Sequence, residues 1–218
     1  MLIPFEKMQG AGNDYVLIDG RVEELDWGRL AVAICDRRFG VGSDGLLVIS
    51  NSMEAPVRMA MYNPDGSEAE MCGNGIRCFA KYIAERGVVD GVSEKVDIET
   101  GIGVLTAVFT PSDTGIKEVR VSMGEPCFRP DQIPVITDKN DPILDLQISV
   151  EGTDMELSCV SMGNPHSILF TDIPVNSFPL ERIGPVVERH GDFPNRTNFE
   201  IVNILSSKHF NMRVWERG

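Results

Sequence analysis

The residues best suited to chemistry lie between Asn63 and Cys78, where a polar, turn-rich segment leads into Cys72-Gly73-Asn74-Gly75. Apolar residues then recur at helical spacing from Ile76 onward. The first N–H groups of a helix have no partner within the helix, so they favour an anion. The same positive end stabilises a thiolate. The spacing therefore predicts a reactive thiolate, able to act as nucleophile or base, beside a site for a carboxylate-sized anion.

A simpler interpretation exists for each cysteine of this run. Free cysteine is usually a small, buried and inert residue. For Cys72 the flanking glycines favour chemistry instead, because Gly73 and Gly75 allow a ligand to approach the backbone closely. Cys78 lies inside the predicted helix, and the structural interpretation is preferred there.

Alternating short strands and a few helices must position this cysteine. Strands are predicted at Tyr15 to Ile18, Gly45 to Ile49 and Arg58 to Tyr62, and period-two runs continue after residue 95. One helix is expected after the N-cap Asp26, and another runs from Ile76 to a stop at Gly87. The segment 124–142 carries four prolines and is interpreted as an excursion. A polar stretch at 110–115 places the boundary between an N-terminal half, 1–114, and a C-terminal half, 115–218.

A weak internal repeat supports two related halves. The segment 12–18 can be laid over 163–169, and in each copy a predicted helix and an Arg-x-Gly sequence follow at the same spacing. The strand at 58–62 then matches 212–215. Matches in the same order and at near-equal spacing indicate a duplication.

Composition excludes several classes of function. The 218 residues are 42% hydrophobic and carry a net charge of −13, with a pI near 4.6. Binding to nucleic acid or to an anionic membrane surface is therefore not expected. No apolar run is long enough to span a membrane, and no secretory signal is seen. Five cysteines without a Cys-x2-Cys pair predict neither a disulfide framework nor a metal site, and indicate a reduced, cytoplasmic protein.

The run from Asn63 to Cys78 resembles that of diaminopimelate epimerases. Three further segments agree in the same order: Lys7 to Tyr15, Ser161 to His166, and Trp215 to Gly218. The stretch 37–42 also fits the pattern. Four separated motifs in order are far more specific than a single Cys-Gly-Asn-Gly.

The resemblance implies an α/β (α+β) fold of two pseudo-symmetric halves, each a curved, mainly antiparallel sheet wrapped round a central helix. It also implies an active site in the cleft between them, and conversion of LL- to meso-diaminopimelate for lysine and peptidoglycan. No pyridoxal phosphate, metal or other cofactor is expected. The implied partners are a small amino-acid substrate and a second copy in a homodimer. Inversion needs an acid and a base on opposite faces of one carbon, and in the family two cysteines supply them.

Site residues follow from the resemblance by position. Cys72 matches one catalytic cysteine, and His166 and Glu216 match residues that tune the cysteine pairs. Gly73 and Asn74 would hold the substrate's α-carboxylate. Recognition of the distal end falls to a set of amides and charged groups: Asn13, Asn63, Asn164, Asn198, Glu216 and Arg217.

The chemistry of the distal set suits an ammonium and a carboxylate. Arg217 can bind a carboxylate through two parallel hydrogen bonds, and asparagines or Glu216 can address an ammonium group. Individually, Asn13 and Asn164 could be turn residues, and Glu216 with Arg217 could be a solvated ion pair. Asn195 lies close to Asn198 in the sequence and could instead be the residue that matches the family's substrate-binding position.

One departure concerns the second cysteine. The family carries it in an Ala-Cys-Gly-Thr-Gly stretch directly after Glu-Arg-Gly, whereas the 218 residues stop at Gly218. Cys127 and Cys159 lie in other motifs. Taken as it stands, the chain is expected not to epimerise diaminopimelate.

Three alternative functions remain. A related racemase, for example one acting on histidine, would share Cys72 but differ at the distal end. A non-catalytic protein could bind an amino-acid carboxylate at the helix that follows Cys72. A thiol redox protein could use Cys72 and Cys78, although their spacing fits no Cys-x-x-Cys motif.

Overall fold

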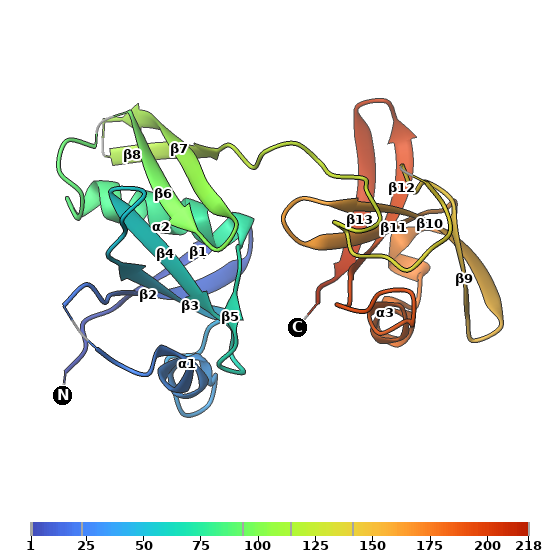
Figure 1. The fold of residues 1–218 in the computed structure, drawn as a ribbon, viewed down its shortest axis with the longest axis horizontal. Coiled ribbons are helices and arrows are strands. Elements are labelled where there is room, and N and C mark those ends of the chain that lie inside the picture. Colours follow the sequence, from blue (N-terminus) through green and yellow to red (C-terminus); the bar gives the residue numbers. More distant parts are fainter. Residues whose placement is uncertain (1, 23, 93, 114, 141, 218) are drawn as a thin grey trace. The chain divides into compact units, whose positions relative to one another are not determined.

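The computed structural model describes residues 2–22, 24–92, 94–113, 115–140 and 142–217. These form two compact units, Met1–Met123 and Gly124–Gly218 (Figure 1). The division lies later than the predicted boundary at 114/115, because the strand Gly115–Val121 pairs with Gly103–Ser112 and belongs to the first sheet. Thr114 and Gly218, which end the two predicted halves, lie outside the described residues.

The first unit is one large mixed sheet with two helices. Its eight strands run in the order β1-β2-β3-β4-β6-β7-β8, and β5 pairs with β4. Five of the seven strand pairs are antiparallel, and β2/β3 and β4/β6 are parallel. The elements are β1 (Glu6–Gly10), β2 (Asn13–Asp19), α1 (Trp27–Cys35), β3 (Gly45–Ser50), β4 (Val57–Tyr62), β5 (Glu68–Ala69), α2 (Gly73–Glu85), β6 (Lys95–Thr100), β7 (Gly103–Ser112) and β8 (Gly115–Val121).

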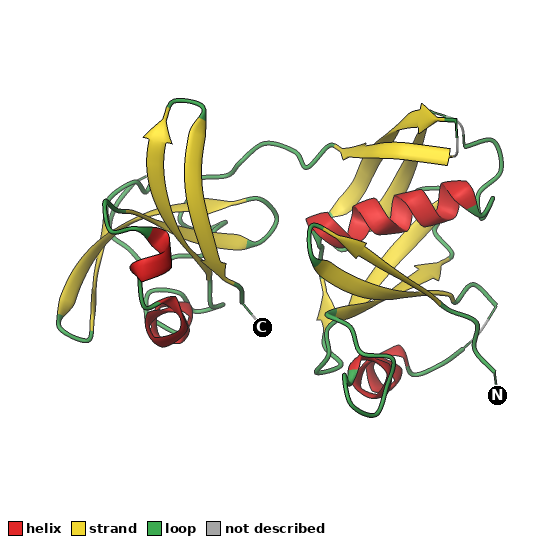
Figure 2. Ribbon diagram, turned by 180° about the vertical axis from the view of Figure 1, so that it is seen from behind, coloured by secondary structure: helices red, strands yellow, loops and turns green. Residues whose placement is uncertain are grey.

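The curved sheet encloses α2, which Figure 2 shows lying across its strands. Ile76, Phe79 and Ile83 form the buried stripe of the helix, as their spacing predicts. They pack against alternate residues of β2 to β4 and against Val96, Ile98, Ala107 and Phe109 of β6 and β7. The helix begins three residues earlier than Ile76, with Cys72 as its N-cap. Beyond the C-cap Arg86, Gly87 has φ +62°, the left-handed conformation that the predicted stop requires.

Helix α1 packs on the opposite face of the same sheet. Asp26 caps this helix as predicted, because its side chain accepts a hydrogen bond from the Arg29 N–H at 2.9 Å. Ala31 and Cys35 pack on Val16, Ile18, Leu46 and Val48, the even-numbered residues of β2 and β3. Both faces of these two strands are therefore buried, and the strands are fixed between two layers of side chains.

The second unit is a smaller sheet with one α-helix. Its strand order is β13-β12-β11-β10-β9, with only β11/β12 parallel. A turn at Glu151 and Gly152 joins β9 to β10. The proline-rich 124–142 segment forms an isolated bridge between Cys127 and Ser161 and adds Ile133 and Val135 to the core. The elements are β9 (Leu146–Val150), β10 (Thr153–Ser161), β11 (Pro165–Phe170), η1 (Val175–Ser177), α3 (Leu180–Glu188), β12 (Asn198–Ser206) and β13 (His209–Trp215).

The two units share one β–α–β–β arrangement. In the first, β2 and β3 are parallel, α1 connects them, and β4 returns antiparallel to β3. In the second, β11, α3, β12 and β13 have the same order and pairing. These are the segments that the sequence repeat pairs. Parallel neighbours need a crossover connection, so the helix is required at this place in both copies.

The sheet of the second unit packs one face on α3, whereas its other face is open only in part, since Glu200 and Val202 on that face are buried. Phe199, Ile201 and Trp215 pack with α3 on the buried face. The alternate positions Ile204, Phe210 and Met212 are more than half exposed. Among the described residues, no helix is both long enough and apolar enough to cross a lipid bilayer.

Candidate active site

Cys72 sits at the junction of a strand and a helix, partly exposed. Its backbone is extended (φ −144°, ψ 115°), and its carbonyl accepts the Ile76 N–H at 2.9 Å. Its Sγ atom accepts a hydrogen bond from the Gly75 N–H at 3.4 Å and lies 3.0 Å from the hydroxyl of Tyr15 on β2. An ideal Cβ at Gly75 would lie 3.3 Å from Leu47 and 3.4 Å from the Cys72 Cβ. The first turn is thus packed tightly around the sulfur, with the Gly75 N–H directed at it and the Tyr15 hydroxyl within hydrogen-bond distance.

Asn13 and Asn74 join the tip of the β1–β2 hairpin to this helix start. Asn74 Nδ2 donates to Asn13 Oδ1 at 2.7 Å, and Arg77 donates to both Gly73 O at 2.8 Å and Asn74 Oδ1. The guanidinium therefore adds a positive charge to the N-terminal end of α2. A helix start and a cation together favour an anionic ligand.

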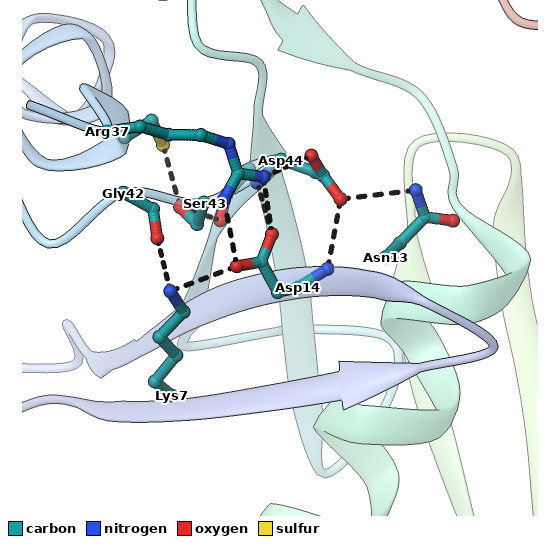
Figure 3. Close-up of polar contacts among 9 residues, drawn as sticks. Lys7, Asn13, Asp14, Arg37, Gly42, Ser43 and Asp44 are labelled. Carbon is teal, nitrogen blue, oxygen red and sulfur yellow. Dashed lines mark hydrogen bonds and ion pairs between the residues drawn. The ribbon is translucent and has the colours of Figure 1, made fainter.

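A network of charged side chains holds the strand end that carries Asn13 (Figure 3). Arg37 donates to Asp14 and to Asp44, at 2.8 and 2.7 Å. Lys7 lies 2.9 Å from Asp14, and Asn13 Nδ2 donates to Asp44 Oδ2 at 3.3 Å. The hydrogen bond from Arg37, aided by Lys7, holds the pKa of Asp14 well below its usual value, so this carboxylate stays charged. The side-chain amide of Asn13 is therefore held at its oxygen by Asn74 and at its nitrogen by Asp44.

Asn63 lies in the turn between β4 and β5. Its Nδ2 donates to Ser67 Oγ at 3.0 Å, and its backbone pairs with Ser67 and Gly66. Asp65 accepts from both the backbone and the hydroxyl of Ser67. These contacts stabilise the hairpin turn that leads to Cys72.

Asn164, His166 and Glu200 form the polar cluster of the second unit. His166 Nδ1 lies 2.6 Å from Glu200 Oε1, and its Nε2 lies 2.9 Å from Asn164 Oδ1. Glu200 is only 6% exposed, and its second oxygen is buried without a hydrogen-bond partner among the described residues. Both ring nitrogens therefore have a side-chain oxygen within hydrogen-bond distance, and these contacts fix the orientation of the ring.

Asn198 joins the ends of three segments of this unit. Its Nδ2 donates to Pro165 O at 2.9 Å, and its Oδ1 accepts the Arg217 N–H at 2.8 Å. Arg217 is exposed and donates to Asn195 O at 2.9 Å, and Glu216 is exposed beside it. The predicted residues of the second unit thus come together, but Asn198 uses its amide on backbone groups.

Trp215 and Glu188 hold the strand end that precedes Glu216. Trp215 Nε1 donates to Glu188 Oε2 at 2.9 Å, and Arg196 donates to the other oxygen at 3.2 Å. The Glu188 side chain is only 4% exposed. The indole also packs on Gly184, where a Cβ would meet its atoms at 2.5–2.7 Å.

The remaining cysteines differ from Cys72 in their surroundings. Burial raises the pKa values of Cys35 and Cys78, and raises that of Cys159 to about 12. Cys127 is partly exposed and lies 2.7 Å from Gln132 Oε1. In the described part of the chain, no three His, Cys, Asp or Glu side chains gather as a metal ion would require. Cys72 is the cysteine that combines exposure with donors for a thiolate.

Two residues of these clusters were missed from the sequence. Its position in an apolar run indicates only a strand for Tyr15, although period two places it on the same face as Asn13. Glu200 stands between Phe199 and Ile201 in a buried strand. A charged residue at such a position needs a partner, and that was the available signal.

The sequence is similar to curated proteins along almost its whole length. The family model described as diaminopimelate epimerase matches residues 5–128. The diaminopimelate epimerase of Agathobacter rectalis is 45% identical over 221 residues, which cover 98% of this chain and 76% of that protein. That of Moorella thermoacetica is 45% identical over 216 residues, with the same coverage. The chain thus spans about three quarters of the length of these relatives.

Solved structures show the same fold at low sequence identity. A probable proline racemase from Agrobacterium radiobacter K84 superposes with a TM-score of 0.70 at 14% identity, covering 98% of this chain and 70% of that one. A hydroxyproline epimerase from Agrobacterium vitis gives 0.68 at 16% identity, covering 96% and 69%. At these identities the likeness establishes the architecture of two related sheet units.

Proposed function

The chain belongs to the diaminopimelate epimerase family, and on that premise we propose that it converts LL- to meso-diaminopimelate by moving the α-proton through a cysteine thiolate. The activity is that of an isomerase acting on an amino acid, a step toward lysine and peptidoglycan. The observation that carries the proposal is Cys72 at the N-cap of α2, with the Gly75 N–H and the Tyr15 hydroxyl directed at its sulfur.

Cys72 serves one face of the α-carbon. Its thiolate removes the proton, the Cα–H bond breaks and an S–H bond forms, and the electron pair stays on Cα. The carboxylate beside that carbon must spread the charge, so it needs donors where it lies. Gly73 and Asn74 offer helix N-terminal N–H groups, and Arg77 adds a positive charge. Inversion requires a second acid or base on the opposite face.

The substrate's distal groups are assigned to the remaining predicted residues. Asn13, Asn63, Asn164, Asn198, Glu216 and Arg217 are proposed to bind the distal ammonium and carboxylate. The exposed guanidinium of Arg217 suits a carboxylate. His166 is proposed to tune thiol chemistry, and contacts at both of its ring nitrogens hold it in place.

A cytoplasmic location and a homodimer complete the proposal. All five cysteines are free, which suits a reducing compartment. The homodimer rests on the family resemblance, and sedimentation equilibrium tests it.

The test separates proton exchange from inversion. The protein is mixed with LL-diaminopimelate in heavy water, and NMR and chiral chromatography then follow α-deuterium and configuration separately. Deuterium at the α-carbon is expected to depend on Cys72, so Cys72→Ala abolishes exchange. Inversion of the configuration also requires the acid or base on the opposite face of the α-carbon, so it reports on that group as well. Cys127→Ala, at the other partly exposed cysteine, is the matched control and leaves exchange unchanged.

A second readout is binding. Diaminopimelate is expected to slow alkylation of Cys72 by iodoacetamide, whereas lysine, which lacks the distal carboxylate, protects less. Absence of both α-deuterium and protection, in a protein that is folded by circular dichroism, would refute the proposal. Equal protection by histidine would assign the site to a different amino acid.

A further inference from the structure

We propose that Tyr15 is a further catalytic residue, whose hydroxyl donates a hydrogen bond to the Cys72 thiolate and stabilises its negative charge. The proposal deepens the proposed function and rests on it for the identity of the substrate. It concerns the sulfur that takes up the α-proton, so Tyr15 contacts a reacting atom.

The contact is short and enclosed. The Tyr15 oxygen lies 3.0 Å from Cys72 Sγ, closer than the 3.4 Å that separates the sulfur from the Gly75 nitrogen. Tyr15 is only 2% exposed. A hydrogen bond to a charged group gains strength when water is excluded, because the local dielectric constant is low. Of the two groups, the hydroxyl is therefore the closer, and both belong to buried residues.

The fold prevents Tyr15 from turning away. Its ring packs in the α2 core with Leu17 and Leu47, and its Cδ1 would lie 3.6 Å from a Cβ at Gly45 on the paired strand. The neighbouring Asn13 bonds to Asn74, so β2 is tied to the first turn of α2 two residues before Tyr15 as well. Asp14, between them, is held by Arg37. The donor is fixed before any ligand arrives, which is the condition for electrostatic stabilisation without reorganisation.

Other groups near the sulfur do not replace this donor. Cys78, on the same helix, interacts electrostatically with Cys72 and with Arg77. Cys78 is a buried thiol whose pKa is raised by burial. Arg77 directs its hydrogen bonds to Gly73 and Asn74. From β3, the residue that packs against this turn is the apolar Leu47.

The proton balance is simple. In the resting site, Tyr15 O–H donates to the thiolate. When Cys72 takes the α-proton, the new S–H bond replaces the charge, and Tyr15 keeps its own proton throughout. On return of the proton to Cα the S–H bond breaks, and the hydroxyl again donates to sulfur.

The experiment uses Tyr15→Phe, which keeps the ring and removes only the hydroxyl. Alkylation of Cys72 by iodoacetamide is followed by mass spectrometry from pH 6 to pH 10. Since a hydrogen bond of this kind is worth about 0.5–1.5 kcal/mol, the rate at pH 7 is expected to fall about 3- to 10-fold. The rates should converge at high pH, where the thiol is deprotonated in both proteins. Tyr62→Phe, on β4, is the matched control, and Cys127 in the same sample is the internal one.

A second measurement uses the unmutated chain. With tyrosine labelled at the ring carbon bearing oxygen, three NMR signals are expected, because the sequence has three tyrosines. Only the Tyr15 signal should move when Cys72 is alkylated. If it stays still, or if Tyr15→Phe reacts at the parental rate throughout, the proposal is overturned.

Exchange of the substrate's α-proton distinguishes this proposal from the proposed function. A shifted alkylation profile together with slower exchange in Tyr15→Phe supports both. A shifted profile with no exchange even in the parent supports the Tyr15–Cys72 hydrogen bond and contradicts the epimerase assignment. An unchanged alkylation profile with normal α-proton exchange in Tyr15→Phe supports the epimerase assignment and refutes a catalytic role for Tyr15.

Discussion

Replacing Gly184 with alanine sets a favourable local effect against an unfavourable tertiary one. In the interior of a helix, alanine is better than glycine by about 1 kcal/mol. At this position, however, the new Cβ would lie 2.5–2.7 Å from three atoms of Trp215. Overpacking of a core costs about 1–3 kcal/mol. Three contacts this short belong in the upper part of that range, so the clash outweighs the gain.

Trp215 has little freedom to relieve the clash. Its indole N–H is bonded to the buried Glu188, and its backbone pairs with Phe199 on β12. We therefore expect Gly184→Ala to lower the free energy of unfolding by about 1–2 kcal/mol, which moves the urea midpoint by about 0.5–1 M. The end of β13 should shift as well, and with it Arg217, whose N–H bonds to Asn198.

The assay follows Trp215 directly. In a Trp27→Phe background, Trp215 is the single tryptophan of the sequence, so its emission reports both the clash and the urea transition. Gly191→Ala is the control, because no atom lies within 4 Å of its Cβ. Adding Trp215→Leu should turn the effect of Gly184→Ala from destabilising to neutral or stabilising. A midpoint and emission spectrum that match the parent would refute the reasoning.

Three further predictions concern charge and thiol chemistry. The pKa of Asp14 lies below its ordinary value of 3.8, so the ionised carboxylate stabilises the folded protein fully above about pH 4, and this stabilisation is lost as the pH falls through the lowered pKa. In urea titrations, the parent should therefore be more stable than Asp14→Asn by a smaller margin at pH 3 than at pH 6. Native protein at pH 8 should be alkylated at Cys72 but not at Cys159, whose pKa burial raises to about 12, as peptide mass mapping would show; modification of Cys159 before unfolding would contradict this. Glu200→Gln removes the carboxylate that contacts His166, so the ¹⁵N NMR signals of that ring should shift and the free energy of unfolding should fall by about 1–2 kcal/mol; an unchanged ring spectrum would exclude the pairing.

Local signals predicted the framework well, because each rested on a short-range rule. The cap at Asp26, the stop at Gly87 and the apolar stripe of α2 depend on residues within a few positions of one another. The duplicated β–α–β–β order was visible because it repeats in sequence as well as in space. The polar run followed by apolar residues at helical spacing likewise predicts Cys72 beside a helix start, and Cys72 is the N-cap of α2.

Contacts between distant segments could not be predicted. Period two shows that Tyr15 faces one side of β2, but not that Cys72 lies 3.0 Å from its hydroxyl. The boundary at 110–115 was misjudged because a polar turn looks the same within a hairpin as between units; pairing of β8 with β7 decides which it is. The buried position of Asn198, which bonds to backbone groups at Pro165 and Arg217, is another product of tertiary packing.

The strands that enclose α2 come partly before and partly after it in the sequence, and this order has a consequence during synthesis. Strands β1 to β4 leave the ribosome before the helix, but Ile98 and Phe109, which complete its core, emerge afterwards. At about 5–20 residues per second, that leaves an interval of a few seconds in which the helix is only partly covered. Cys72 meets the cellular environment during this interval without its finished surroundings, so the nascent chain is the stage at which oxidants reach this thiol most easily.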